Sequence, residues 1–289
     1  MAMWRSRTAP ELTPEQRAAT HALVASPKFE LIPMATTLAS AEALPPGSMV
    51  TVTASPTRGM EVTIEIAEAL KARGHTLIPH MSARKIRDRG HLRDLLARLD
   101  TAGIKRIFAV GGDAKDPGDY KDGLSLLRAI EEEGRPFDEI GVPAYPEGHV
   151  NVPPHVLLNA LKDKQPYADY MATQLCFDPA AIAVWVRHVR AEGISLPMHL
   201  GTPGVSDARK LMAVATRIGL ADSARYLRKQ RRVAFRLLRG ATYGPDALLE
   251  GLAPTLVDPS ADIRMLHLFT FNQVAPTVEW QRRVVASLA

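Results

Sequence analysis

The chain has 289 residues, of which 46% are hydrophobic and 23% charged, and its formal net charge is +5 at pH 7. This composition is typical of a soluble globular protein, and the length suits either one α/β barrel or two smaller domains. Cys176 is the single cysteine, which excludes an intrachain disulfide and a four-cysteine metal site and favours a reducing cytoplasm.

The N-terminal residues predict a helix and not a targeting segment. They lack the continuous apolar core of a secretory signal, and Glu11 and Glu15 argue against a transit peptide. No run in the chain approaches the roughly 20 apolar residues of a membrane span. We therefore expect a cytoplasmic protein with no membrane partner. Thr13 and Pro14 mark a helix start, which predicts an N-terminal helical extension over residues 1–28.

From residue 29 onward, short apolar runs rich in β-forming residues alternate with helical patterns. The clearest helical patterns cover residues 57–74, 88–103 and 178–193, and Asp178 is a natural N-cap for the third. Such alternation implies βαβ units, and eight of them predict a single (β/α)8 TIM barrel over residues 29–289 rather than an open doubly wound sheet. The eight predicted strands cover residues 29–34, 49–55, 75–81, 106–113, 139–145, 170–177, 196–202 and 264–271.

The interval before the last strand is long and strongly basic. Residues 203–262 have room for about three helices, so we expect a helical insertion there. Within it, "RYLRKQRRVAFRLLRG" (residues 225–240) could be a polyanion-binding patch or a helix with Leu227 and Leu238 facing inward. No aromatic platform or nucleic-acid-binding motif accompanies it, so we favour a solvated helix face and no nucleic-acid partner.

Three polar residues at strand ends suggest a site. Active sites of such barrels lie at the carboxyl ends of the strands. Glu30 places a carboxylate between Phe29 and Leu31, where burial is costly unless the group is paired, solvated or kept protonated for use. Asp113 and Gln174 lie towards the ends of two other predicted strands, and several polar groups converging in one cleft favour a binding or catalytic site.

Other kinds of chemistry find little support in the sequence. His80, His149 and His199 lack metal-ligand spacing, so no metal site is expected. Cys176 lies between apolar neighbours, as a core thiol does. The run "GGDAKDPGDY" lacks the G-x-G-x-x-G order of a dinucleotide fold, and its glycines suit a tight βα turn. On a barrel rim they would also let the backbone approach a planar cofactor.

Six short motifs carry a resemblance to a known family. In chain order they are "FELIPM", "IPHMSA", "AVGGDAKDPG", "AYPEGH", "ATQLCFD" and "LHLFTFN", spread over residues 29–273. Together they resemble the methylenetetrahydrofolate reductase family. The resemblance implies a (β/α)8 barrel that reduces 5,10-methylenetetrahydrofolate to 5-methyltetrahydrofolate, with FAD carrying hydride from NADH or NADPH to the folate.

The resemblance also implies roles for individual residues. Glu30 matches the general acid that opens the methylene bridge, since hydride cannot easily displace an amine until its nitrogen is protonated. An apolar neighbourhood would raise the pKa of this acid as the role requires. Asp113 matches an aspartate between flavin and pterin, and Gln174 a glutamine that hydrogen-bonds the pterin. The positions matching flavin contacts are Thr51, His80, Gly112, Asp113, Tyr145, His149 and Lys164.

The chain departs from the family pattern where FAD is anchored. "TASPTRG" replaces a tyrosine-glycine-alanine segment, Gly111 replaces an arginine, and no acidic residue for the adenosine ribose stands near residues 157–159. FAD-mediated reduction is favoured, and direct hydride transfer from NADH to the folate remains an alternative. Two further alternatives remain. The barrel could bind folate without catalysis, although the intact Glu30 argues against this, or the enzyme could act on a methanopterin with a deazaflavin. The sequence does not decide between NADH and NADPH. It also does not decide the oligomeric state, and a homo-oligomer is one of the possibilities.

Overall fold

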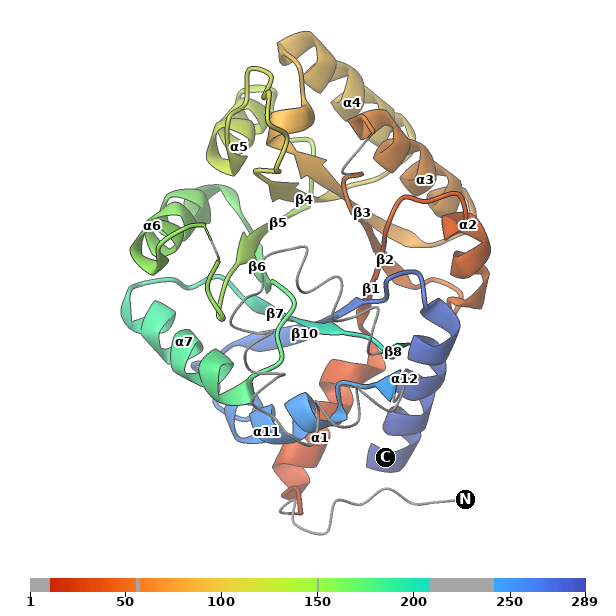
Figure 1. The fold of residues 1–289 in the computed structure, drawn as a ribbon, viewed down its shortest axis with the longest axis vertical. Helices are drawn as coiled ribbons and strands as arrows, with labels where there is room; N and C mark the ends of the chain where they lie inside the picture. The colour runs from red at the N-terminus through yellow and green to blue at the C-terminus, as the bar shows by residue number, and fades with distance from the viewer. Residues whose placement is uncertain (1–10, 56–57, 150, 208–241) are drawn as a thin grey trace.

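A computed structural model describes residues 11–55, 58–149, 151–207 and 242–289. In these residues eight parallel strands close into a barrel in the order β1-β10-β7-β6-β5-β4-β3-β2, as the ring of arrows in Figure 1 shows. The predicted (β/α)8 barrel is therefore confirmed. The strands are β1 (Lys28–Leu31), β2 (Met49–Val52), β3 (Thr76–Ser82), β4 (Arg106–Val110), β5 (Glu139–Ala144), β6 (Tyr170–Thr173), β7 (Met198–Pro203) and β10 (Ile263–Phe269).

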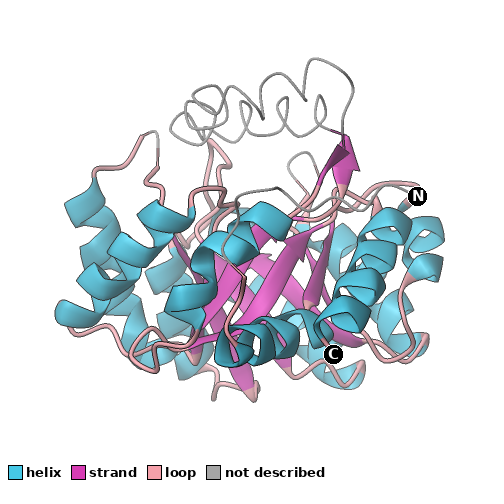
Figure 2. Ribbon diagram, turned by 90° about the horizontal axis from the view of Figure 1, so that it is seen from below, coloured by secondary structure: helices cyan, strands magenta, loops and turns pink. Residues whose placement is uncertain are grey.

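Helices surround the strands on the outside of the ring (Figures 1 and 2). Each of the long ones buries one apolar stripe, as α4 does with Leu92, Leu95 and Leu99. The main helices are α1 (Pro14–Ala25), α3 (Met60–Ala72), α4 (Arg89–Thr101), α5 (Gly123–Glu132), α6 (Pro154–Lys164), α7 (Pro179–Ala191), α11 (Asp246–Leu256) and α12 (Val274–Leu288). Short helical turns add α2 (Thr37–Ser40), η1 (Ala41–Ala43), η2 (Ala83–Lys85) and η3 (Gln165–Tyr167).

Two predicted helix starts are confirmed in detail. Thr13 and Gln16 form a capping box, in which each side chain accepts from the other residue's backbone N–H. The Asp178 side chain accepts from two backbone N–H groups at the start of α7. The helix that precedes the first strand, α1, packs against α11 and α12.

Alternation along the strands decides which side chains enter the barrel. On β1, Phe29 and Leu31 belong to the main apolar cluster that lies between strands and helices, so Lys28 and Glu30 face the interior. The parallel register pairs Glu30 with Thr51 on β2 and with Phe269 on β10. A second apolar cluster, which includes Ile78 and Phe108, fills part of the interior.

The predicted insertion before the last strand is described only at its edges. β8 (Ser206–Asp207) pairs antiparallel with β9 (Thr242–Tyr243), and this small sheet stands at the carboxyl end of the barrel strands in Figure 2. α11 follows and leads into β10. The basic segment 225–240 and most of the predicted helices lie outside the described residues.

Candidate active site

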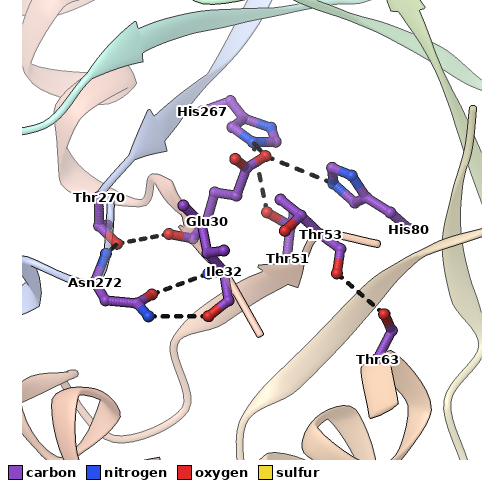
Figure 3. Close-up of polar contacts among 9 residues, drawn as sticks. All are labelled: Glu30, Ile32, Thr51, Thr53, Thr63, His80, His267, Thr270 and Asn272. Atoms are coloured by element: carbon purple, nitrogen blue, oxygen red, sulfur yellow. Dashed lines mark hydrogen bonds and ion pairs between the residues drawn. The ribbon is translucent and has the colours of Figure 1, made fainter. Parts of the chain in front are cut away.

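Glu30 lies inside the barrel between two histidines from other strands (Figure 3). Its side chain points inward near the carboxyl end of β1, and 7% of the residue is exposed. One carboxylate oxygen, Oε2, lies 3.0 Å from Nε2 of His267 on β10 and 3.6 Å from Nε2 of His80 on β3. Thr51 Oγ1 lies 3.5 Å from the same His267 nitrogen. Four strands thus contribute to one polar cluster.

The burial of this cluster changes its titration. Desolvation raises the pKa of Glu30 to about 7, although the nearby His80 partly counteracts this. Desolvation lowers the pKa of His80 to about 4, and desolvation together with the Lys28 charge lowers that of His267 to about 3. Near neutral pH both imidazoles are therefore uncharged, and a large fraction of Glu30 carries a proton. This arrangement suits a general acid.

The loop after β10 fixes the end of β1 (Figure 3). The Asn272 side chain accepts from the Ile32 backbone N–H at 2.9 Å and donates to the Ile32 carbonyl at 2.9 Å. The Thr270 hydroxyl donates to the Glu30 carbonyl at 2.6 Å. Phe271 and Asn272 both have left-handed φ values, 50° and 58°, which few non-glycine residues adopt. The backbone that carries Glu30 is thereby held in one position.

Asp113 lies on an exposed loop after β4, and neighbouring residues fix that loop. Gly112 has φ +86°, and a Cβ there would lie 2.1 Å from the Ser82 Oγ, so this position requires glycine. The Arg84 guanidinium donates to three backbone carbonyls of the same loop, those of Ala114, Lys115 and Lys121. The hydrogen bonds from Arg84 therefore hold the loop in place, although Asp113 itself is exposed to solvent.

Gln174 follows β6 and ties two loops together at the same end of the barrel. Its side-chain amide donates to the Gly148 carbonyl at 2.9 Å. Glu147 accepts from the backbone N–H groups of Phe177 and Asp178, at 2.6 and 2.8 Å. The loops after β5 and β6 are therefore joined twice. Glu30, Asp113 and Gln174 all lie at the carboxyl end of the parallel barrel, as the strand order requires.

The remaining candidates lie in three places. Thr51 and His80 face the barrel interior and belong to the Glu30 cluster. Tyr145 and His149 lie on the loop after β5, with their rings edge-on at 5.5 Å. Lys164 ends α6, and its side chain lies beside Gly123 at the start of α5. Desolvation lowers the pKa of Lys164, and the charge of Asp122 partly offsets this.

His267 is the residue that the sequence analysis missed. It stands in the motif "LHLFTFN", and its alternation with Leu266 and Leu268 indicates an inward side chain. That alternation could have drawn attention to it, but the contact with Glu30 depends on the barrel closing. His199, for which no metal role is expected, stacks on Tyr170 with ring centroids 4.0 Å apart. Among the described residues, no group of three or more His, Cys, Asp or Glu is placed to hold a metal ion.

The fold and the buried acid define a (β/α)8-barrel protein with a candidate site at the carboxyl ends of its strands. The sequence model of methylenetetrahydrofolate reductase matches residues 26–221, which is more than half of the chain. The chain belongs to the methylenetetrahydrofolate reductase family, and the resemblance carried by the six motifs is confirmed.

Curated relatives agree with this family. Methylenetetrahydrofolate reductase 2 of Schizosaccharomyces pombe is 31% identical over 150 residues, which are 45% of this chain and 23% of that protein. A probable methylenetetrahydrofolate reductase (NADPH) of Caenorhabditis elegans is 32% identical over 122 residues, which are 39% of this chain and 18% of that protein. The matched region thus spans about a fifth of the length of these relatives.

Solved structures give a looser likeness. A putative lyase/mutase from Burkholderia cenocepacia J2315 superposes with a TM-score of 0.48 at 12% identity, covering 95% of this chain and 86% of that one.

None of the helices in the described part of the chain is both long and apolar enough to cross a membrane.

Proposed function

We propose that the protein is an oxidoreductase that interconverts 5,10-methylenetetrahydrofolate and 5-methyltetrahydrofolate by hydride transfer from NADH or NADPH, with Glu30 as general acid. The observation that carries this proposal is the burial of Glu30 between two neutral imidazoles, which gives it a pKa of about 7. Folate binding alone needs no such acid, and maintaining one at this position costs stability.

The chemistry follows from what Glu30 can deliver. The folate carries a methylene group bridged between two nitrogens, and neither nitrogen leaves readily as an anion. Protonated Glu30 gives its proton to one bridge nitrogen, the carbon–nitrogen bond opens, and the resulting iminium carbon accepts hydride. Glu30 is left as a carboxylate and regains a proton before the next turnover. His80 and His267 stay uncharged because their pKa values lie near 4 and 3.

Asp113 and Gln174 are the proposed folate contacts at the rim. Asp113 is exposed on a braced loop and can accept hydrogen bonds from pterin N–H groups. The Gln174 amide is held by its contact with Gly148, which leaves its carbonyl oxygen as a further acceptor. Both lie at the end of the barrel towards which β1 carries Glu30.

A flavin fits the residues around the mouth in part. Tyr145 and His149 supply ring surfaces and polar atoms, the Gly112 backbone is open at the rim, and Lys164 supplies a cation for a phosphate. Thr51 and His80 lie deeper and act through the Glu30 cluster. If bound there, FAD would accept hydride from the nicotinamide and pass it to the folate.

One observation favours a second candidate, direct hydride transfer from NADH to the folate without flavin. Leu157, which lies in the stretch 157–159 where no acidic residue for the adenosine ribose is found, lines an apolar cavity of about 390 Å³ between α6 and α7, together with Leu161 and Trp185. A ribose has hydroxyl groups to satisfy, and this surface offers them no carboxylate.

The absorbance spectrum of the purified full-length protein separates these candidates. With FAD bound, the protein is yellow and releases FAD on denaturation. A colourless protein that oxidises NADH only in the presence of methylenetetrahydrofolate supports direct transfer and rejects FAD. Folate binding without turnover, with either nicotinamide donor and with FAD added, rejects the reductase proposal and leaves a binding protein.

The compartment, assembly and domain division are part of the same proposal. We place the protein in the cytoplasm, where the free and buried Cys176 suits a reducing environment. The proposed division is the one predicted from the sequence, an N-terminal helical extension, whose described helix is α1 (Pro14–Ala25), followed by a catalytic barrel. A homo-oligomer is compatible with this assignment.

A further inference from the structure

We propose that His267 is a positioning residue for the acid. Its Nε2–H donates to Oε2 of Glu30, holds the carboxyl group in one orientation, and stabilises the carboxylate that remains after proton transfer. This inference rests on the proposed function and extends it to a residue that touches neither folate nor nucleotide.

The geometry supports a fixed orientation. His267 Nε2 and His80 Nε2 both approach the same oxygen, Oε2, at 3.0 and 3.6 Å. With Oε2 held by His267, we place the transferable proton on Oε1. The His267 ring is itself packed by aromatic neighbours, with its centroid 4.9 Å from that of Phe269 and 6.4 Å from that of Phe108. The imidazole therefore has little freedom to turn away.

The surrounding charges keep His267 a neutral donor. Lys28 lies directly beside it in the β1–β10 register, is fully buried, and sits 3.8 Å above the Tyr170 ring. Protonating His267 would place a second buried cation next to this ammonium group, which is electrostatically unfavourable. Among the described residues, the titratable and charged groups in or at the edge of this part of the interior are Lys28, Glu30, His80, Arg106, Glu139, Tyr170 and His199.

A neutral donor has a specific chemical use here. When Glu30 gives up its proton, a carboxylate forms in a desolvated site, and a preplaced N–H bond to that carboxylate stabilises it without any proton moving onto His267. Without the donor, the carboxylate is harder to form. The pKa of Glu30 then rises, so Glu30 keeps its proton to higher pH. It also transfers that proton to the folate more slowly.

Two substitutions separate this role from others. In His267→Gln, the side-chain amide can reach the place of Nε2 and donate a hydrogen bond to Glu30. Unlike imidazole, the amide cannot accept a proton at one atom and release it from another. His267→Leu fills similar space without a donor. We expect His267→Leu to lower kcat about 10- to 100-fold, as for the loss of one hydrogen bond to a charged group, with KM for the folate nearly unchanged. We expect His267→Gln to recover most of this loss.

A direct measurement of Glu30 keeps the test independent of turnover. The carboxyl C=O infrared band, assigned by its loss in Glu30→Gln, is followed against pH in the substrate-free full-length protein. In His267→Leu its midpoint should rise by about one pH unit, and in His267→Gln it should stay near that of the unsubstituted protein. The control is His199→Leu, which removes another buried imidazole and should leave the midpoint unchanged, since no hydrogen bond or ion pair joins His199 to Glu30 among the described residues.

Each outcome decides the question. An unchanged midpoint in folded His267→Leu overturns the proposal and leaves His267 a packing residue. A kcat loss in His267→Gln as large as in His267→Leu also overturns it and points to a proton carrier. If the protein proves to have no reductase activity, the proposed function fails while the midpoint still reports on His267. Should His267→Leu not fold, His267→Met is the second variant without a donor.

Discussion

The interior of the barrel and its rim are built in different ways. Inside, Glu30, His80 and His267 come from three strands, and strand register alone brings them together. At the rim, Asp113 and Gln174 lie on loops, and contacts to backbone atoms hold these loops in place. Function inside the barrel depends on burial and electrostatics, whereas function at the rim depends on loop geometry. Substitutions in the two regions should therefore have different signatures.

The largest expected effect is on turnover and comes from the interior. Glu30→Gln keeps the size of the side chain and removes the proton, so kcat should fall by about 10²–10⁴-fold while folate binding is retained. In the unsubstituted protein, activity should decline as pH rises through about 7, because the acid loses its proton there. Steady-state kinetics and fluorescence titration with folate measure the two quantities. Near-normal turnover in Glu30→Gln would remove Glu30 from the catalytic role.

The same substitution should stabilise the fold. The folded-state pKa of Glu30 is about 7, raised from 4.5, so burying the carboxylate destabilises the protein increasingly as pH rises from about 4.5 to 7. Glu30→Gln should therefore unfold at higher urea concentration at pH 8, by about 3 kcal/mol in the free energy of unfolding, and show little difference near pH 4.5. The exposed Glu131→Gln serves as control. An equal difference at both pH values would contradict the assigned titration.

At the rim, Gly112 should be the most sensitive position. Gly112→Ala forces an L-residue to φ +86° and brings its Cβ against the Ser82 Oγ. We expect a loss of about 2 kcal/mol in stability, or several degrees in the melting temperature. Adding Ser82→Ala should relieve the contact but not the backbone conformation, so it recovers only part of the loss. Complete recovery would show that the contact alone requires glycine.

The sequence predicted the barrel well because its cues are local. Strand and helix periods, the Thr13 and Asp178 caps, and the glycines after α3, α4 and α7 depend on neighbouring residues. It also pointed to Glu30, because a carboxylate between Phe29 and Leu31 is unusual whatever the fold.

The sequence could not show what surrounds that carboxylate. The contact between Glu30 and His267 joins residues 237 positions apart, and the alternation of β10 predicts only the direction of the side chain. The hydrogen bonds that hold the rim loop could not be predicted from the sequence for a similar reason. Arg84 looked like any surface arginine, and only its contacts with the carbonyls after β4 reveal its role.

Arg84 gives the smallest predicted effect and the sharpest test of the contrast between the two regions. Arg84→Met removes three hydrogen bonds to the loop that carries Asp113 and leaves the Glu30 cluster intact. Loosening this loop should weaken folate binding, raising KM about 10-fold, while kcat and its dependence on pH stay unchanged. Arg87→Met is the matched control, because the Arg87 side chain is exposed and its hydrogen bond and ion pair among the described residues are with Glu61, not with the loop that carries Asp113. A change in the pH dependence of kcat in Arg84→Met would mean that the rim loop also tunes the acid, and the two regions would then act as one.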